Sequence, residues 1–142
     1  MTSSSLTYEK YYFDNGQLKA EGWIEEGSKE RYWFYYYPNG SLKSKGNFKS
    51  NTRSGYWYYY DEKGLLHKEG HYEDGVATSW WRYYHGDTIE TVILKQGNKE
   101  GLALYKVDGK PVKAEYYKND RRTHEWYSLA DYRKDKPDLE RL

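Results

Sequence analysis

Two histidines and a glutamate alternate along one short stretch of this sequence, and such residue types can hold a metal ion. His67, Glu69 and His71 occur within "LHKEGHY". Alternate residues of a β-strand point to the same face, so a strand here would bring imidazole and carboxylate groups together. Neither histidine recurs at an equivalent position elsewhere in the chain. We therefore interpret the stretch as a solvated polar row, and we expect no metal and no cofactor.

Other arrangements that could support catalysis are missing from the sequence. The adjacent carboxylates Glu25 and Glu26 precede a glycine, which is typical of a turn, and His85 and His124 are isolated. No serine or threonine lies in a nucleophile elbow, and no glycine-rich loop is of the kind that cradles phosphate. The chain has no cysteine, so disulfides and thiolate ligands are excluded. We predict that the protein is not an enzyme.

The aromatic content is the most unusual feature of the composition, with 19 Tyr, 6 Trp and 3 Phe among 142 residues. Tyrosine and tryptophan can bury a ring while a polar tip stays in water, which suits a thin structure with little fully buried volume. The same residues, together with arginine, are those that protein-binding hot spots favour. Binding of a partner is therefore the chemistry that this composition supports best.

Charge and hydropathy restrict the partners and the location that we expect. The net charge is +1, from 23 basic and 22 acidic side chains, so no strong field attracts nucleic acid or acidic lipid. The first residues, "MTSSSLTYEKYYF", contain neither the basic nor the apolar segment of a secretion signal. No stretch reaches the roughly 18 apolar residues of a membrane span. We expect a cytoplasmic protein that binds neither nucleic acid nor membranes.

The sequence repeats with a period of 24 residues. The repeat is regular over residues 8–84 and degenerate over residues 85–127, where Tyr105 and Trp126 stand at aromatic places. The charged tail, residues 128–142, lies outside the repeat as a short helix, a cap or frayed coil. The columns that share the 24-residue step include Tyr12, Tyr36, Tyr60 and Tyr84; Trp33, Trp57 and Trp81; Gly22, Gly46 and Gly70; and Leu18, Leu42 and Leu66.

Each repeat is predicted to form two strands. "QLKAEGWIE" alternates with a period of two, and "RYWFYYY" consists mostly of residues that favour strands. The pairs Asn15-Gly16 and Asn39-Gly40 predict type I′ turns, which need positive φ at both central residues. A looser loop such as "EGSK" would close the other end. The predicted fold class is all-β, an elongated single-layer antiparallel meander of about five β-hairpins.

The expected turns determine which residues face each other. A two-residue loop at Asn39-Gly40 places Trp33 opposite Gly46, and a four-residue "EGSK" loop places it opposite Gly22 as well. The next repeat places Trp57 between two glycines in the same way. An indole needs bare backbone beside it, and a bulky ring can cover a glycine in a neighbouring strand. We therefore expect a row of tryptophans that pack on glycines.

The degenerate fourth repeat offers an internal check of this pairing. Its tryptophan place is held by Ala103, and the facing glycine place is held by Val92 or Ile93. The large residue now stands in the glycine place and the small residue in the tryptophan place. Such an exchange is expected if the two places pack against each other.

A single-layer sheet must cover both faces with its own side chains, so each repeat has two different faces. One carries the leucine, glycine and tryptophan columns, and the other interleaves aromatic rings with charged side chains. The second face is either structural filler or a surface that recognises a protein. The residues that we propose for partner binding are Trp23, Tyr32, Phe34, Tyr36, Tyr56, Tyr58, Tyr60, Trp80, Arg82 and Tyr84.

The segments "YYFDNGQLKAEGW", "YYYPNGSLKSKGNF" and "YYDEKGLLHKEGHY" resemble the MORN-repeat variant of bacterial YwqK-like antitoxin and immunity-like proteins. The resemblance covers about residues 8–127 and is specific in the first three repeats. It implies an elongated meander of β-hairpins that is used for protein contacts. Some members of that family are similar to antitoxins that are encoded beside a toxin.

Three functions are compatible with these observations. The one that we favour is a non-catalytic antitoxin or immunity protein that binds a toxin and occludes its active site. The second is a sugar- or cell-wall-binding module, because aromatic hairpin repeats also bind choline and glucans. The third is a membrane-linked MORN scaffold, against which the near-neutral charge counts. Free sheet edges would in addition allow two copies to pair as a homodimer.

Overall fold

The computed structural model describes residues 5–139, with the side chains of residues 5–135. This part of the chain contains twelve β-strands and one α-helix, which confirms the predicted all-β class. It forms two compact units that meet in the sequence at Ala77 and Thr78. Among the described residues, no helix is long and apolar enough to cross a membrane.

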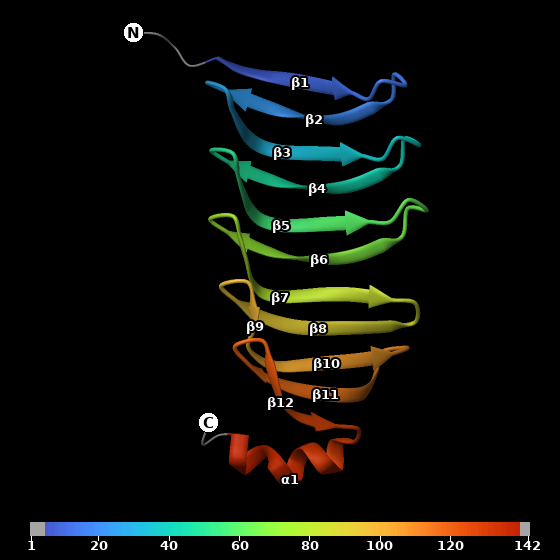
Figure 1. Cartoon of the computed structure of the whole chain (residues 1–142), viewed down its shortest axis with the longest axis vertical. Helices are drawn as coiled ribbons and strands as arrows, with labels where there is room; N and C mark the ends of the chain where they lie inside the picture. Colours follow the sequence, from blue (N-terminus) through green and yellow to red (C-terminus); the bar gives the residue numbers. More distant parts are fainter. Residues whose placement is uncertain (1–4, 140–142) are drawn as a thin grey trace. The chain divides into compact units, whose positions relative to one another are not determined.

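The first unit is an antiparallel meander of three hairpins, and its strands follow one another in chain order (Figure 1). Each strand pairs with the next one along the chain, so the single-layer meander that the repeat predicts is confirmed in this unit. The strands are β1 (Leu6–Tyr12), β2 (Leu18–Glu25), β3 (Ser28–Tyr36), β4 (Leu42–Lys49), β5 (Thr52–Tyr60) and β6 (Leu66–Glu73).

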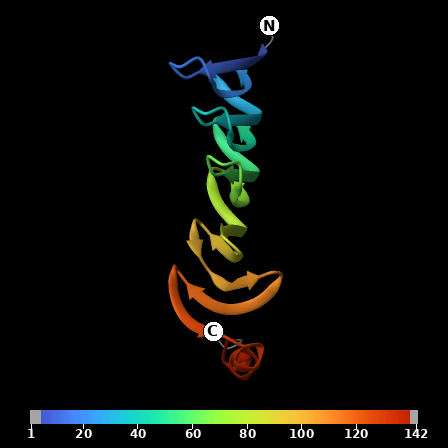
Figure 2. The ribbon, with the colours of Figure 1, turned by 90° about the vertical axis from the view of Figure 1, so that its right-hand side faces the viewer.

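The second unit continues the antiparallel pattern and ends in a helix. Its main strands pair in the order β7-β8-β10-β11-β12, and the short β9 pairs with β8. Figure 2 shows how strongly β10 and β11 curve. The elements are β7 (Val76–His85), β8 (Thr88–Lys95), β9 (Asn98–Lys99), β10 (Gly101–Val107), β11 (Lys110–Lys118), β12 (Arg121–Trp126) and α1 (Leu129–Leu139).

The helix α1 lies next to β12 (Figure 1), so the segment Leu129–Leu139 of the tail forms the helix that was one of its expected states, and residues 140–142 lie outside the described residues. Ser128 begins the helix as its N-cap. The backbone N–H of Asp131 donates to Ser128 Oγ at 3.1 Å, which satisfies one of the N–H groups that a helix leaves unpaired at its start.

The Asn39-Gly40 turn differs from the predicted type I′ form. Gly40 has a positive φ of 90°, whereas Asn39 does not have a positive φ. The loop contains three residues and is closed by two hydrogen bonds, from Tyr37 N to Ser41 O at 2.8 Å and from Gly40 N to Tyr37 O at 2.9 Å. The fixed φ of Pro38 suits the second position of a type I turn followed by a left-handed glycine, but it is not required, because the loops that end at Gly16 and Gly64 have the same hydrogen bonds without a proline.

Type I′ geometry occurs instead at the opposite ends of the hairpins, where we expected looser loops. Glu26 and Gly27 both have positive φ, at 49° and 78°, and Ser50 and Asn51 follow the same rule at 49° and 65°. These turns contain two residues, because Glu25 pairs directly with Ser28. The prediction of which end carries the tight primed turn was therefore wrong.

The strand register at the tryptophan and glycine places is nevertheless as predicted, because bulges compensate for the different loops. Tyr35 pairs with Ser44 and Tyr36 pairs with Leu42, so Lys43 is an extra residue between the two pairs. A second irregularity lies where β4 passes from Gly46 to Asn47 along β5. Together these shifts restore the offset that the simpler turns would have produced.

The leucine column is not where we predicted it: Leu18, Leu42 and Leu66 pair with Tyr12, Tyr36 and Tyr60, so the leucines lie on the side opposite to the tryptophans.

The predicted tryptophan–glycine packing is confirmed in the first unit. Trp33 pairs with Gly46, and Trp57 pairs with both Gly46 and Gly70. Each ring rests on the glycine of the preceding strand. A Cβ atom on Gly46 would lie 2.3 Å from the Trp57 ring, and one on Gly22 would lie 2.2 Å from the Trp33 ring. No side chain fits at these two glycines while the rings keep their places.

The indole N–H groups provide a contact that the sequence does not reveal. Trp33 Nε1 donates to the carbonyl oxygen of Trp23 at 3.1 Å, and Trp57 Nε1 donates to that of Asn47 at 3.0 Å. Each acceptor immediately follows the glycine beneath the ring, at the irregularity in the strand pairing. The bulge therefore turns a backbone carbonyl toward the buried indole, whose side chain is 0% exposed in both cases.

We call the side of the first unit that carries Trp33 and Trp57 the tryptophan face, and the opposite side, which carries Phe34 and Tyr58, the tyrosine face. The core lies on the tryptophan face. Its buried residues are Ala20, Trp33, Phe48 and Trp57, against which Ile24, Tyr35, Tyr59 and Tyr72 pack.

The exchange of large and small residues is confirmed in the second unit. Trp81 pairs with Val92, so Val92, and not Ile93, holds the glycine place. Val92 and Ala103 are each only 1% exposed. An alanine in the tryptophan place thus accompanies a valine in the glycine place.

The edge strand β1 breaks the tryptophan column. Glu9 pairs with Gly22 and so occupies the place that Trp33 takes in β3. Its carboxylate accepts a hydrogen bond from the Tyr11 hydroxyl at 2.6 Å. A charged residue at this place on an edge strand disfavours pairing with another strand, which weakens the case for a homodimer through β1.

Candidate functional site

One row of side chains crosses the tyrosine face of the first unit. Phe34 pairs with Glu21 and Lys45, and Tyr58 pairs with Lys45 and Glu69. Residues that pair directly across antiparallel strands lie on the same face. The row therefore reads Glu21, Phe34, Lys45, Tyr58, Glu69, with charged and aromatic side chains interleaved.

The rings beside this row form close pairs. The ring centroids of Tyr32 and Phe34 are 5.2 Å apart, and those of Tyr56 and Tyr58 are 5.0 Å apart. Lys45 Nζ lies 5.2 Å from the centroid of the Tyr58 ring, within the range of a cation–π contact. All five side chains are half-buried. They are held in place and still offer part of their surface to a partner.

Glutamates fix the tyrosine hydroxyls of this face. Tyr8 and Tyr36 both donate to the Glu21 carboxylate, and Tyr56 donates to Glu69 at 2.8 Å. The hydrogen bond from Tyr8 is the main reason why the pKa of Glu21 is lowered. Burial, with Glu21 beside it, raises the pKa of Tyr8 to about 12 and raises that of Tyr36 as well. These hydroxyls therefore remain protonated donors at neutral pH.

The structure places seven of the ten proposed binding residues on the tyrosine face of the first unit, and all seven are half-buried. Trp23 joins the others through an edge-to-face contact with Tyr8 at 5.2 Å, and Arg31 lies 5.5 Å from its ring. The seven are Trp23, Tyr32, Phe34, Tyr36, Tyr56, Tyr58 and Tyr60.

The other three proposed residues, Trp80, Arg82 and Tyr84, belong to the second unit. They lie on β7 and pair with Ile93, Thr91 and Ile89 of β8. Trp80 is 46% exposed. Their partners on β8 are thus two isoleucines and a threonine, whereas Phe34 and Tyr58 of the first unit pair with charged residues.

We call the side of the second unit that carries Arg82 and Trp126 the Trp126 face. Its central row reads Arg82, Thr91, Leu104, Ala114, Trp126. A pocket of about 530 Å³ lies between this face and α1. The sequence analysis missed the pocket, although the aliphatic residues of the degenerate repeats, such as Leu102 and Leu104, were a signal for it.

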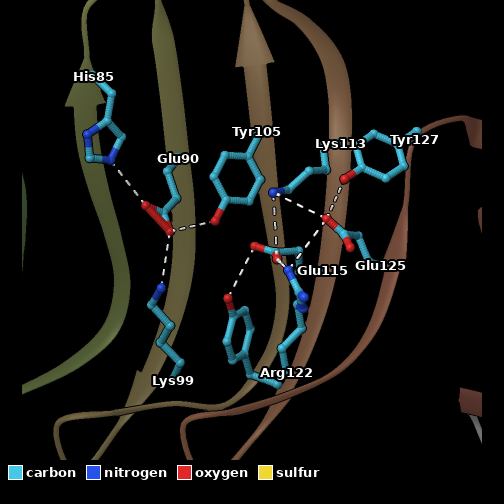
Figure 3. A network of polar contacts seen from close by, with 10 residues as sticks. His85, Glu90, Lys99, Tyr105, Lys113, Glu115, Arg122, Glu125 and Tyr127 are labelled. Carbon is cyan, nitrogen blue, oxygen red and sulfur yellow. Dashed lines mark hydrogen bonds and ion pairs between the residues drawn. The ribbon is translucent and has the colours of Figure 1, made fainter.

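The opposite side of the second unit, which we call the Trp81 face, carries a polar network (Figure 3). Tyr105 donates to Glu90 at 3.0 Å, and Lys99 contacts the same carboxylate at 3.2 Å. Arg122 donates to Glu115 at 2.9 Å, and Lys113 lies 3.7 Å from it. Glu90 and Glu115 are buried. The cationic and hydroxyl partners of each carboxylate offset the free-energy cost of removing it from water.

The network shifts the pKa values of its members. Burial of Glu115 by itself would raise its pKa, but the nearby hydroxyls of Tyr105 and Tyr117, the hydrogen bond from Arg122 and the charge of Lys113 outweigh it and lower the pKa. Burial and the two glutamates raise the pKa of Tyr105 strongly. Glu115 is therefore ionised, and Tyr105 is protonated, at neutral pH.

The lowered pKa of Glu115 predicts loss of stability in acid. Because the unfolded chain binds this proton at a higher pH than the folded one does, the contribution of Glu115 is complete above its ordinary pKa of 4.5 and is lost as the pH falls through the folded value. Glu115→Gln should lower the free energy of unfolding at pH 7 by roughly 1–3 kcal/mol. It should also flatten the pH dependence below 4.5, as measured by urea unfolding.

Glu62→Gln provides the control, since Glu62 is exposed in a turn of the first unit. This variant should keep the wild-type pH dependence. An unchanged acid slope in Glu115→Gln would contradict the role assigned to the network.

The histidine row lies on β6, and it is only partly the solvated row that we expected, because Glu69 between the two histidines is buried and accepts a hydrogen bond from Tyr56. His67 and His71 are exposed, and the His71 ring contacts Tyr56 edge-to-face at 4.7 Å. Within the described part of the chain, no group of three or more His, Cys, Asp or Glu side chains is arranged to hold a metal ion.

Comparison with known proteins adds no relative. No protein-family model matches the sequence, and no curated protein matches it. The resemblance to MORN-type antitoxin and immunity proteins therefore stays a prediction that rests on the repeat residues alone.

Proposed function

We propose that this protein is a non-catalytic binding protein that holds a protein partner on the tyrosine face of its first unit. The observation that carries the proposal is the row in which Phe34 and Tyr58 alternate with Glu21, Lys45 and Glu69. Half-buried rings in fixed positions supply contact area at little entropic cost. The charged side chains between them favour one orientation of the bound partner.

Two features of this face support a role in binding over a role as structural filler. The tyrosine hydroxyls are anchored to carboxylates, so the rings do not have to be ordered when a partner arrives. The core of the unit lies on the other face. Residues of the tyrosine face can therefore serve recognition without carrying the main packing.

The resemblance to antitoxin and immunity-like proteins suggests the class of partner. We propose a toxin whose active site is occluded by the bound sheet, with no chemical step on this chain. The partner then loses activity in proportion to the complex formed, and inhibition is reversible.

The experiment is affinity capture from the native host with mass spectrometry, followed by calorimetry with the captured protein. We expect Tyr58→Ala to weaken binding by about 10–100-fold, because a hot-spot aromatic residue near the centre of an interface contributes about 2 kcal/mol or more. Phe34→Ala, its neighbour in the row, should act in the same direction. Trp80→Ala tests whether the second unit contributes as well.

Lys68→Ala is the matched control on the tryptophan face, where the lysine lies 4.8 Å from the Tyr59 ring. It should leave the affinity unchanged, and Tyr58→Ala should keep the wild-type thermal midpoint within a few degrees. Equal weakening by Lys68→Ala and Tyr58→Ala would refute the assignment of the face. Conversion of a substrate by the purified chain would refute a purely binding role.

A further inference from the structure

The pocket of the second unit lies on the Trp126 face, and it is built mainly from apolar side chains, with Lys113, Tyr127, Ser128 and Tyr132 also in its lining. Its volume of about 530 Å³ falls within the roughly 300–1,000 Å³ of small-molecule sites. The sheet supplies Leu102, Leu104, Val112 and Ala114, and the far wall includes Trp126. Leu129 and Tyr132 of α1 close one side.

The pocket exists because the degenerate repeats depart from the others at specific places. Leu104 pairs with Ala114 just as Phe34 pairs with Lys45, so the two aliphatic residues occupy the places of a ring and a long charged side chain. Leu102 likewise stands one residue before the tryptophan place, where the earlier repeats have a tyrosine or a tryptophan. Smaller side chains at these places leave space above the sheet.

Val112 marks the same change at the mouth of the pocket. It is the extra residue between the pairs Tyr105–Lys113 and Lys106–Pro111. In the first unit the equivalent bulge residue is Lys19 in one hairpin and Lys43 in the next. A charged place of the repeat has thus become apolar, and Val112 is 43% exposed.

The helix does not collapse into the space, because Trp126 holds it at a distance. Trp126 Nε1 donates to Asp135 Oδ2 at 2.6 Å, and its ring meets Tyr132 edge-to-face with centroids 5.3 Å apart. Trp126 itself is only 3% exposed. This buried residue therefore fixes the helix and forms a wall of the pocket at the same time.

The charges near the pocket are directed away from it. Lys113 contributes to the lining, but its ammonium lies 3.4 Å from Glu125 and 4.5 Å from the centroid of the Tyr105 ring. Tyr105 and Lys113 pair on the Trp81 face, whereas Leu104 and Ala114 pair on the Trp126 face. An ionised ligand would find no opposite charge in the pocket, so the lining favours an uncharged occupant.

We propose that the second unit binds an uncharged, mainly apolar small molecule in this pocket, with one face against Leu104 and Ala114 and an edge against Trp126. This proposal does not depend on the protein-binding face proposed for the first unit. Failure of one proposal would leave the other unaffected.

A pair of fluorescent probes tests the proposal on the full chain. N-phenyl-1-naphthylamine is uncharged, and 8-anilinonaphthalene-1-sulfonate has the same ring system with an added sulfonate. We expect the uncharged probe to bind saturably with one molecule per chain and to quench tryptophan fluorescence through Trp126. The sulfonated probe should bind at least 10-fold more weakly.

Val112→Lys is the decisive variant, because lysine already occupies the equivalent bulge at positions 19 and 43 and the fold accepts it there. It should weaken binding of the uncharged probe at least 10-fold with an unchanged circular dichroism spectrum. Leu65→Lys makes the same kind of change at a residue of the first unit that is 65% exposed, and it should have no effect.

Three results would overturn the proposal. They are non-saturable binding of the uncharged probe, equal affinity for both probes, and an affinity that Val112→Lys leaves unchanged. Concentration-dependent self-association that Val112→Lys abolishes, without saturable probe binding, would identify a second copy of the chain as the occupant instead.

Discussion

Trp57→Ala should lower the free energy of unfolding of the first unit by about 3–5 kcal/mol, which is the usual cost of removing a large buried aromatic side chain. Trp57 is 0% exposed. Its ring meets those of Phe48 and Tyr72 edge-to-face, with ring centroids 5.1 Å and 6.2 Å apart. The substitution also leaves the carbonyl of Asn47 without the indole N–H that it accepts. Urea unfolding followed by circular dichroism measures the effect.

Tyr58→Ala is the matched control, because Tyr58 is the next residue on the same strand and points to the tyrosine face. It is half-buried, so we expect a loss of no more than about 1 kcal/mol. The contrast between two adjacent aromatic residues tests the division of the sheet into a packing face and a surface face. Equal losses from the two variants would show that the division is wrong.

Gly46→Val should destabilise the first unit by about 3 kcal/mol, at the upper end of the typical cost of overpacking. The new Cβ atom would lie 2.3 Å from the Trp57 ring, which is far inside van der Waals contact. The ring cannot move aside freely, because its N–H is bonded to Asn47 and its edges are packed. The thermal midpoint of the variant measures the loss.

The double variant Gly46→Val with Trp57→Ala should be more stable than the sum of the single losses predicts. It reproduces the natural combination of Val92 and Ala103, both buried in the second unit. Residues in direct contact typically couple by about 0.5–3 kcal/mol. A double-mutant cycle in urea should therefore give a favourable coupling energy of about 1–3 kcal/mol. Simple additivity would mean that the valine–alanine pair of the degenerate repeat is not a packing exchange.

The sequence was sufficient for the strands and for their approximate register. The 24-residue step of Trp33, Trp57 and Trp81 identified equivalent strands, and the period of two within each strand identified the faces. The glycine partners followed from these two facts, because a buried indole in a single-layer sheet needs a strand without a side chain beside it. Val92 in the glycine place was predicted only to within one residue, since the fourth repeat has lost its glycine.

The turns were predicted less well, because their type depends on compensating irregularities. Asn39-Gly40 matches the sequence preference of a type I′ turn, but the hairpin closes with a three-residue loop, as do the two hairpins of the first unit that lack a proline at this place. The Glu26–Gly27 turn is tighter than its sequence suggested. The resulting offset is absorbed by Lys43 as a bulge residue, and no local sequence signal shows where such a bulge will lie.

The sequence by itself determined the all-β repeat, the tryptophan–glycine packing and the composition of the tyrosine face, because all three depend on short-range periodicity and on side-chain size. Tertiary structure decided where the bulges fall, which carbonyl each indole meets, and on which side of the second unit the apolar residues gather. Trp126 illustrates the difference. Its pairing with Ala114 and its bond to Asp135 join residues of three elements, and a repeat that has lost its regular spacing does not encode such contacts in any single stretch of the chain.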